Sequence, residues 1–175
     1  MSPSESAQRY DTSTIVLHWC TAVLITLLWT VGQIIDWFPR GTPRVSARST
    51  HILLGALLIC VISARIFWRS RHGLRLPLAE PPWMGLVAKG THYTLYVLVV
   101  STVVLGALNV WNRGDHFFGL FVFPKRVAPD DHFKTLVEDL HALSANVLIG
   151  LAAVHALAAL AHHFVRRDGV LRRML

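Results

Sequence analysis

Four long apolar blocks dominate the sequence and restrict the chain to folds that can be built in lipid. They cover approximately residues 13–35, 47–68, 85–110 and 136–165. Each block reaches the roughly 20 residues that an α-helix needs to cross the hydrocarbon core of a bilayer. We therefore predict an all-α integral membrane protein, an up-down four-helix bundle that forms a single domain over residues 1–175.

Composition and charge distribution are typical of a membrane protein. Charged residues make up 15% of the sequence and hydrophobic residues 53%, whereas soluble domains carry roughly 25% charged residues. The formal charge of +7 could suggest nucleic acid, but most of the cations fall in the loops and tails beside the apolar blocks, so we expect no nucleic-acid partner. More Lys and Arg lie on the side of the two termini, which predicts cytoplasmic termini in a bacterial inner membrane.

Two histidines in the fourth block suggest cofactor sites at two depths. His141 and His155 are fourteen residues apart, close to four helical turns, so both imidazoles project from nearly the same face, roughly 21 Å apart along the axis. Histidine within a membrane span is rare and indicates a functional site. Haem iron readily takes axial histidines.

Depth pairs these histidines with histidines from other spans. His51 lies near the periplasmic start of the second span, at the level of His141, and His18 lies near the cytoplasmic start of the first span, at the level of His155. Each pair could hold one haem between facing helices, as bundles do for other cofactors. His92, in the third span, lies at a depth close to that of His18, so a His92–His155 pair stays possible on sequence alone.

Other interpretations compete with haem binding. The histidines could be satisfied polar groups that link helices. Gly55 and Gly150 could admit a porphyrin edge or close helix packing. Arginines at the ends of the second span suit haem propionates, but interface anchors would look the same; they are Arg48, Arg65, Arg69 and Arg71.

Several short motifs resemble those of one known family. They are Leu17-His18-Trp19, Phe38-Pro39-Arg40, His51 at the start of the second span, Asn112-Arg113-Gly114, and the run His141…His155…Leu160-Ala161-His162-His163. In this order and spacing the chain resembles the prokaryotic cytochrome b561 family, in particular its small four-helix members that act as superoxide oxidase.

The resemblance implies two b haems, with axial ligands His18 and His155 for one and His51 and His141 for the other. It also implies an oxidoreductase that oxidises periplasmic superoxide to oxygen and reduces ubiquinone. Arg40 and Arg113 lie in matching motifs, and we expect them to attract the superoxide anion.

The quinone is expected at the cytoplasmic end. His162 lies seven residues past His155, on nearly the same helical face, and could donate to a quinone carbonyl. His92 and Lys89 are candidates for the same pocket.

Two other functions stay open on the sequence. The first is a cytochrome b subunit without catalysis of its own, which carries electrons between quinol and a periplasmic redox partner. The second is a haem-free membrane transporter in which the histidines relay protons or bind a metal. A visible spectrum separates the second from the others.

Overall fold

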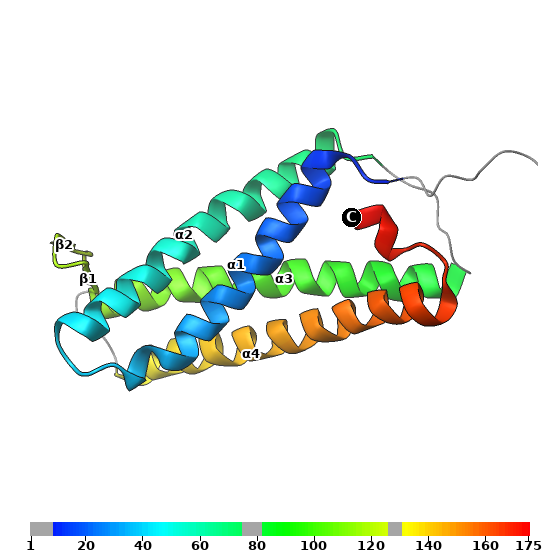
Figure 1. Cartoon of the computed structure of the whole chain (residues 1–175). Helices are drawn as coiled ribbons and strands as arrows, with labels where there is room; N and C mark the ends of the chain where they lie inside the picture. The colour runs from blue at the N-terminus through cyan, green and yellow to red at the C-terminus, as the bar shows by residue number, and fades with distance from the viewer. Residues whose placement is uncertain (1–8, 75–81, 126–130) are drawn as a thin grey trace, which may run out of the picture.

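A computed structural model describes residues 9–74, 82–125 and 131–175, and four long helices account for most of them (Figure 1). They are α1 (Thr12–Ile34), α2 (Thr42–Arg71), α3 (Pro82–Arg113) and α4 (Asp131–Ala161). All four are long and apolar enough to cross a membrane. The prediction of an all-α fold with four spanning helices is thus confirmed.

The helices associate as two pairs. α1 packs along α2 and α3 packs along α4, whereas contacts between the two pairs are few. Leu24, Leu58, Ile62, Val99 and Leu148 form the small buried core where the pairs meet. The interior between the pairs is therefore the place where side chains from different pairs can face one another.

The first helix begins at a well-made cap. Asp11 accepts hydrogen bonds from the backbone nitrogen of Thr14 at 2.9 Å and from its hydroxyl at 2.7 Å, as N-cap residues do. The same carboxylate accepts from Trp68 Nε1 at 2.6 Å and from Leu74 N at 3.3 Å. One side chain thus joins the start of α1 to the end of α2.

Helices α2 and α4 begin about five residues before their apolar blocks. α2 begins at Thr42, directly after Gly41, whose φ of 100° ends the preceding turn, and Pro43 occupies its first turn, where proline fits best. α4 begins at Asp131, an acidic residue favoured at a helix N-terminus. Part of the segment between the second and third apolar blocks falls on residues 75–81, and part of the segment between the third and fourth blocks on residues 126–130, all of which lie outside the described residues.

Between α3 and α4 the chain forms a small antiparallel hairpin of β1 (His116–Phe117) and β2 (Phe121–Val122). Fully buried Ser49 of α2 attaches this hairpin to the bundle: its hydroxyl accepts from Phe118 N at 2.8 Å and lies 3.1 Å from the carbonyl oxygen of His116. We call this side of the molecule the hairpin end.

The opposite side carries the start of α1 and the C-terminal segment, and is called the terminal end (Figure 1). After α4 the chain forms a π-helical turn, η2 (His162–Arg166), and a short 3-10 helix, η3 (Leu171–Met174). This segment folds back onto α1 and the residues before it. Trp19 Nε1 of α1 donates to the Met174 carbonyl at 2.8 Å, and Tyr10 N donates to the Arg173 carbonyl at 3.0 Å.

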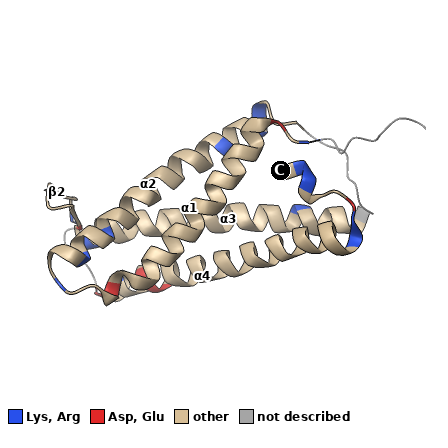
Figure 2. Cartoon of the chain, in the orientation of Figure 1, with Lys and Arg blue, Asp and Glu red and all other residues tan. Residues whose placement is uncertain are grey.

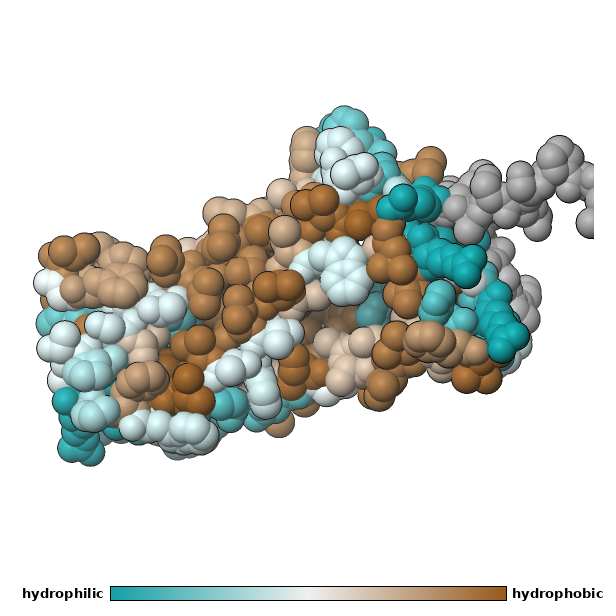
Figure 3. Space-filling model, in the orientation of Figure 1, coloured by the Kyte–Doolittle hydropathy of each residue, from teal (hydrophilic) through white to brown (hydrophobic). Residues whose placement is uncertain are grey.

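The surface has the pattern of a membrane protein. Lys, Arg, Asp and Glu gather at the two ends, whereas the long middle of the bundle is nearly free of them (Figure 2). The visible face is largely apolar there (Figure 3), and exposed Val, Leu, Ile and Phe side chains occur along all four helices. The chain is therefore a multi-pass membrane protein with most of its charges at its two ends.

Candidate functional site

Two pairs of imidazoles face each other across the two helix pairs. His18 of α1 and His155 of α4 have ring centres 6.3 Å apart, with planes at 82°. His51 of α2 and His141 of α4 have ring centres 6.2 Å apart, with planes at 78°. All four residues are half-buried. The structure thus brings together the pairs expected from depth in the sequence.

The ring spacing fits a metal ion between each pair. Imidazole nitrogens bind metal ions at about 2.0–2.1 Å, so two rings on opposite sides of one ion have centres about 6 Å apart. Both observed separations match this value. The four histidines are therefore suitable axial ligands for two haem irons, one at each depth.

His141 is oriented for ligation by the backbone of α3. Its Nδ1 lies 3.0 Å from the carbonyl oxygen of Thr102, and because a carbonyl can only accept, Nδ1 carries the proton. Nε2 is then the unprotonated nitrogen, which can bind a metal. Metal-binding histidines commonly have such a second hydrogen bond, which fixes tautomer and ring direction.

Two glycines that the sequence interpretation passed over make room for the ligands of the hairpin-end pair. A Cβ at Gly106 would lie 3.1 Å from His141 Cε1, and one at Gly32 would lie 3.4 Å from His51 Cε1. Gly55 and Gly150, which the sequence singled out, have no such neighbour within 4 Å among the described residues. Close packing against another helix therefore does not explain these two.

His92 also reaches the pair near the terminal end. Its ring centre lies 5.3 Å from that of His155, shorter than the separation of about 6 Å that a shared metal ion requires. It is also exposed, whereas His18 is half-buried. The geometry favours His18 over His92 as the partner of His155.

Arg65 of α2 lies directly against this pair. Its Nη2 is 2.9 Å from His18 Nδ1, and its guanidinium carbon lies 5.3 Å from the ring centre of Tyr96 on α3. The sequence indicated only that arginines at the ends of this span could serve a cofactor. The contact with His18 depends on how α1 and α2 cross, which sequence spacing does not reveal.

The candidate quinone residues lie toward the terminal end. His162 Nδ1 pairs with Asp168 Oδ2, and the other oxygen of Asp168 accepts from Val170 N at 3.2 Å. Burial raises the pKa of Asp168, but the hydrogen bonds from His162 and the Val170 backbone outweigh it, so the pKa lies below its usual range. Sequence reasoning missed Asp168, which meets His162 only because η2 and the following turn reverse the chain. Lys89 is exposed on α3.

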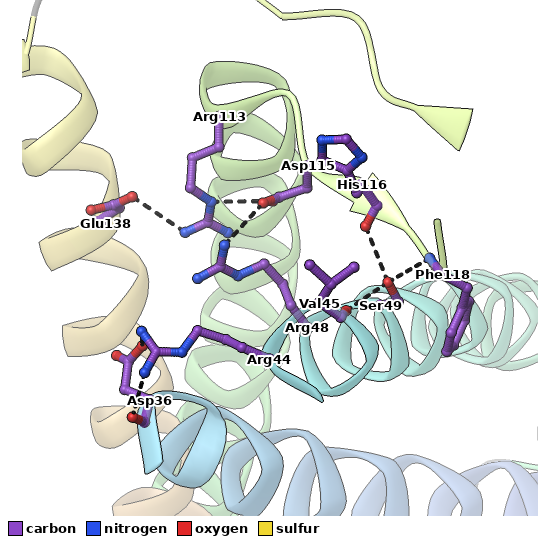
Figure 4. Close-up of polar contacts among 10 residues, drawn as sticks. All are labelled: Asp36, Arg44, Val45, Arg48, Ser49, Arg113, Asp115, His116, Phe118 and Glu138. Carbon is purple, nitrogen blue, oxygen red and sulfur yellow. Dashed lines mark hydrogen bonds and ion pairs between the residues drawn. The ribbon is translucent and has the colours of Figure 1, made fainter. Parts of the chain in front are cut away.

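Ion pairs join three helices at the hairpin end (Figure 4). Arg113 bonds Asp115 Oδ2 at 3.1 Å and Glu138 Oε1 at 3.2 Å, and Arg48 lies 3.4 Å from Asp115 Oδ1. Asp115 is only 6% exposed. The sequence interpretation expected Arg113 to attract an anionic substrate, and in the structure its guanidinium is paired with Asp115 and Glu138.

A cavity of about 420 Å³ opens beside these ion pairs. Its lining residues are Val45, Arg48, Asn112, Arg113, Gly114, Asp115, His116, Lys125, Asp131 and Lys134. Asn112 is 1% exposed, and neither polar atom of its side chain has a partner within the described part of the chain. Arg40 is exposed and is not part of this lining, so the structure does not bring Arg40 and Arg113 into one site.

Over nearly its whole length the chain is similar to known bacterial cytochromes. The sequence model of a family described as prokaryotic cytochrome b561 matches residues 9–175. Cytochrome b561 homolog 1 of Escherichia coli (strain K12) is 30% identical over 171 residues, covering 95% of this chain and 97% of that protein. Probable superoxide oxidase CybB of Yersinia pestis is 28% identical over 172 residues, covering 96% of each. Cytochrome b562 of Cereibacter sphaeroides is 26% identical over 171 residues, covering 95% of this chain and 94% of that protein.

Proposed function

The chain belongs to the prokaryotic cytochrome b561 family, and we propose that it holds two b haems, oxidises superoxide and reduces ubiquinone in a bacterial inner membrane. The coarser part follows from the family: this is a membrane electron-transfer protein of the oxidoreductase class, and haem b is the cofactor that the family implies. Superoxide as the electron donor is supported by the relative that is named probable superoxide oxidase, whereas ubiquinone as the acceptor rests on the resemblance described above.

One observation carries the proposal, namely the two imidazole pairs with ring centres 6.3 and 6.2 Å apart at two levels of α4. His18 with His155, and His51 with His141, would be the axial ligands. The bound haems would supply reversible one-electron oxidation and reduction. Two such centres, roughly 21 Å apart along one helix, are suitable for moving electrons across the bilayer.

The reaction balances with two superoxide ions for each quinone. Each superoxide loses one electron and becomes dioxygen, and two electrons with two protons convert ubiquinone to ubiquinol. We place superoxide oxidation at the hairpin end, facing the periplasm, because the cavity there is lined by Lys125 and Lys134, which have no ion-pair partner among the described residues. Such cations attract small anions.

The arginines have different tasks in this proposal. Arg40, which is exposed, attracts superoxide from solution. Arg113 holds Asp115 and Glu138 and contributes to the same attraction only through the net charge of the cavity. We place the quinone at the terminal end, where His162, oriented by Asp168, would donate a proton to it and where His92 and Lys89 would border it.

The test is anaerobic spectroscopy of the purified protein. We expect two b haems per chain, reduction of their bands when superoxide is generated, and reoxidation when ubiquinone is added. A colourless protein, or one that holds a single haem, would overturn the proposal. Two haems that superoxide leaves oxidised would reject the reaction and keep the cytochrome, and a partner protein purified in equal amount would favour an electron-transfer subunit.

The entry of superoxide needs a separate test at low salt. We expect Lys125→Gln with Lys134→Gln, and separately Arg40→Gln, to slow superoxide-driven quinone reduction, with the difference from wild type fading as salt screens the charges. Arg44→Gln is the matched control, because Arg44 at the same end is bound to Asp36 and to the Phe38 carbonyl. Equal rates in all variants would remove the claim of attraction.

A further inference from the structure

Arg65 is a cation within a membrane-spanning helix, and it has no anionic partner among the described residues. It belongs to the span Thr42–Arg71, its Nε is buried without a hydrogen-bond partner, and none of the ion pairs among the described residues includes it. A charged side chain inside a membrane is costly and usually marks a functional site with a specific partner. The Arg65 guanidinium is therefore expected to bind a specific anionic partner.

The contact between Arg65 and His18 is incompatible with metal binding through His18 Nε2. Arginine has only donors, so His18 Nδ1 must be the acceptor across the 2.9 Å that separate it from Arg65 Nη2. A neutral histidine that binds a metal through Nε2 carries its proton on Nδ1. Ligation by His18 would thus set two donors against each other, and Arg65 would have to turn to a different acceptor.

The other helix pair has no such conflict. His141 Nδ1 faces the carbonyl oxygen of Thr102 at 3.0 Å and already has the tautomer that ligation needs. A rearrangement on haem binding is therefore expected at the terminal-end site and not at the hairpin-end site.

From these observations, and resting on the proposed haem binding, we propose that Arg65 binds a propionate carboxylate of the haem held by His18 and His155. Haem b carries two propionates, and a guanidinium matches a carboxylate with two parallel hydrogen bonds. Arg65 stays close to the pair because Tyr96 of α3 lies beneath it, with 5.3 Å between the guanidinium carbon and the ring centre. The ion pair would satisfy the unpartnered Nε and release His18 Nδ1.

The matched control is Arg69, one helical turn further along α2. Its guanidinium carbon lies 5.3 Å from the ring centre of Tyr10, and its Nη1 donates to the Leu74 carbonyl at 3.5 Å. Arg65→Gln removes the proposed partner of the propionate, Arg65→Lys keeps the charge without the fork of donors, and Arg69→Gln removes an equal charge outside the site.

The experiment measures the reduction potential of each haem and the resonance Raman bending modes of the propionates. Arg65→Gln should lower the reduced-to-oxidised ratio of one haem about tenfold at a fixed potential, which is about 59 mV for one electron, because loss of a cation favours the oxidised state. That haem should be the one missing from His18→Ala. Arg69→Gln should change the reduced-to-oxidised ratio of neither haem. Arg65→Lys should keep this ratio within about threefold of wild type but should shift the propionate modes.

Three results would overturn the inference. They are unchanged propionate modes in Arg65→Gln or Arg65→Lys with both haems bound, a response confined to the other haem, and an effect on the KM for ubiquinone alone. If Arg65→Gln does not accumulate, the Raman spectrum of Arg65→Lys decides. A protein without haem would contradict the proposed function, whereas two haems indifferent to Arg65 would contradict only this inference.

Discussion

At the scale of single residues, a small set of side chains distinguishes this bundle from an ordinary membrane anchor. The rings of His18, His51, His141 and His155 meet across helices in two pairs, and backbone or side-chain groups contact His18 and His141 at Nδ1. Removal of one ring should therefore affect one site and leave the other.

We expect His51→Ala to lose the hairpin-end haem, because a metal ion left with His141 alone loses one of its two axial ligands. The purified variant should contain about half the haem per chain of the wild type, measured from the absorbance of the extracted pyridine complex. His92→Ala is the control: its ring is too close to His155 for a shared metal ion, so both haems should stay. Loss of a haem in His92→Ala, with two retained in His18→Ala, would reverse the assignment.

Gly106 provides a test that leaves all four ligands in place. A Cβ there would lie 3.1 Å from His141 Cε1, so Gly106→Val should displace the ring from the Thr102 carbonyl and reduce occupancy of the hairpin-end haem several-fold. Gly90→Ala on the same helix meets no atom within 4 Å and should bind two haems. Equal haem content in both variants would show that His141 has room to move.

The ligand residues could be predicted from the sequence because histidine is rare in lipid and its depth can be read from the ends of each block. Their neighbours could not. Thr102, Gly106 and Gly32 matter only through contacts with a different helix, and no spacing along one chain segment reveals which helix lies opposite. Asp168 escaped notice because it meets His162 through a π-helical turn.

At the scale of elements, the apolar blocks predicted the existence and order of the four helices but not their ends. Polar residues such as Thr42 and Asp131 begin helices that extend beyond the hydrocarbon core. Two-residue strands leave almost no periodic pattern, and the β1–β2 hairpin depends on the hydroxyl of Ser49 in α2. Both features are set by capping and tertiary contacts, which hydropathy does not measure.

The contribution of the Asp11 cap at the start of α1 to stability can be measured by its pH dependence. Burial raises its pKa, but hydrogen bonds from Thr14, Trp68 and Leu74 outweigh burial and lower the pKa from 3.8 to about 2. Because the folded pKa is the lower one, the stabilisation is complete above about pH 4 and disappears as the pH falls toward 2. Asp11→Ala should cost about 1 kcal/mol, as loss of an N-cap typically does.

The measurement is thermal unfolding in detergent at several pH values. The Tm of wild type should exceed that of Asp11→Ala by a constant amount from pH 5 to pH 7. This Tm difference should shrink as the solution is acidified from pH 5 toward pH 2. Asp11→Asn, which can still cap the helix, should fall between the two and show no titration of its own. A difference that grows on acidification would contradict the assigned direction of the pKa shift.

At the scale of the whole molecule, the two charged ends and the apolar middle define how the protein sits in a bilayer (Figures 2 and 3). The excess of Lys and Arg on the side of the termini predicts that the terminal end faces the cytoplasm. The proposed reaction needs this orientation, because superoxide would approach the hairpin end from the periplasm.

Orientation can be checked by cysteine labelling in intact cells. Leu120, at the tip of the β-hairpin, is 79% exposed, and Leu175 at the other end is 52% exposed. In a background where Cys20 and Cys60 are replaced by alanine, a membrane-impermeant maleimide should label Leu120→Cys in cells with a permeable outer membrane and should label Leu175→Cys only after lysis. The opposite pattern would place the hairpin end in the cytoplasm.

Helix α4 supplies one ring to each imidazole pair, so the number of residues between His141 and His155 cannot change without moving one ring away from its partner. A single alanine inserted anywhere from 142 to 154 would turn His155 by about 100° relative to His141, so that one of the two could no longer face its partner. Substitutions in this stretch preserve the angle, whereas insertions and deletions do not. Over evolutionary time the segment should therefore accept changes of residue type while its residue count stays constant.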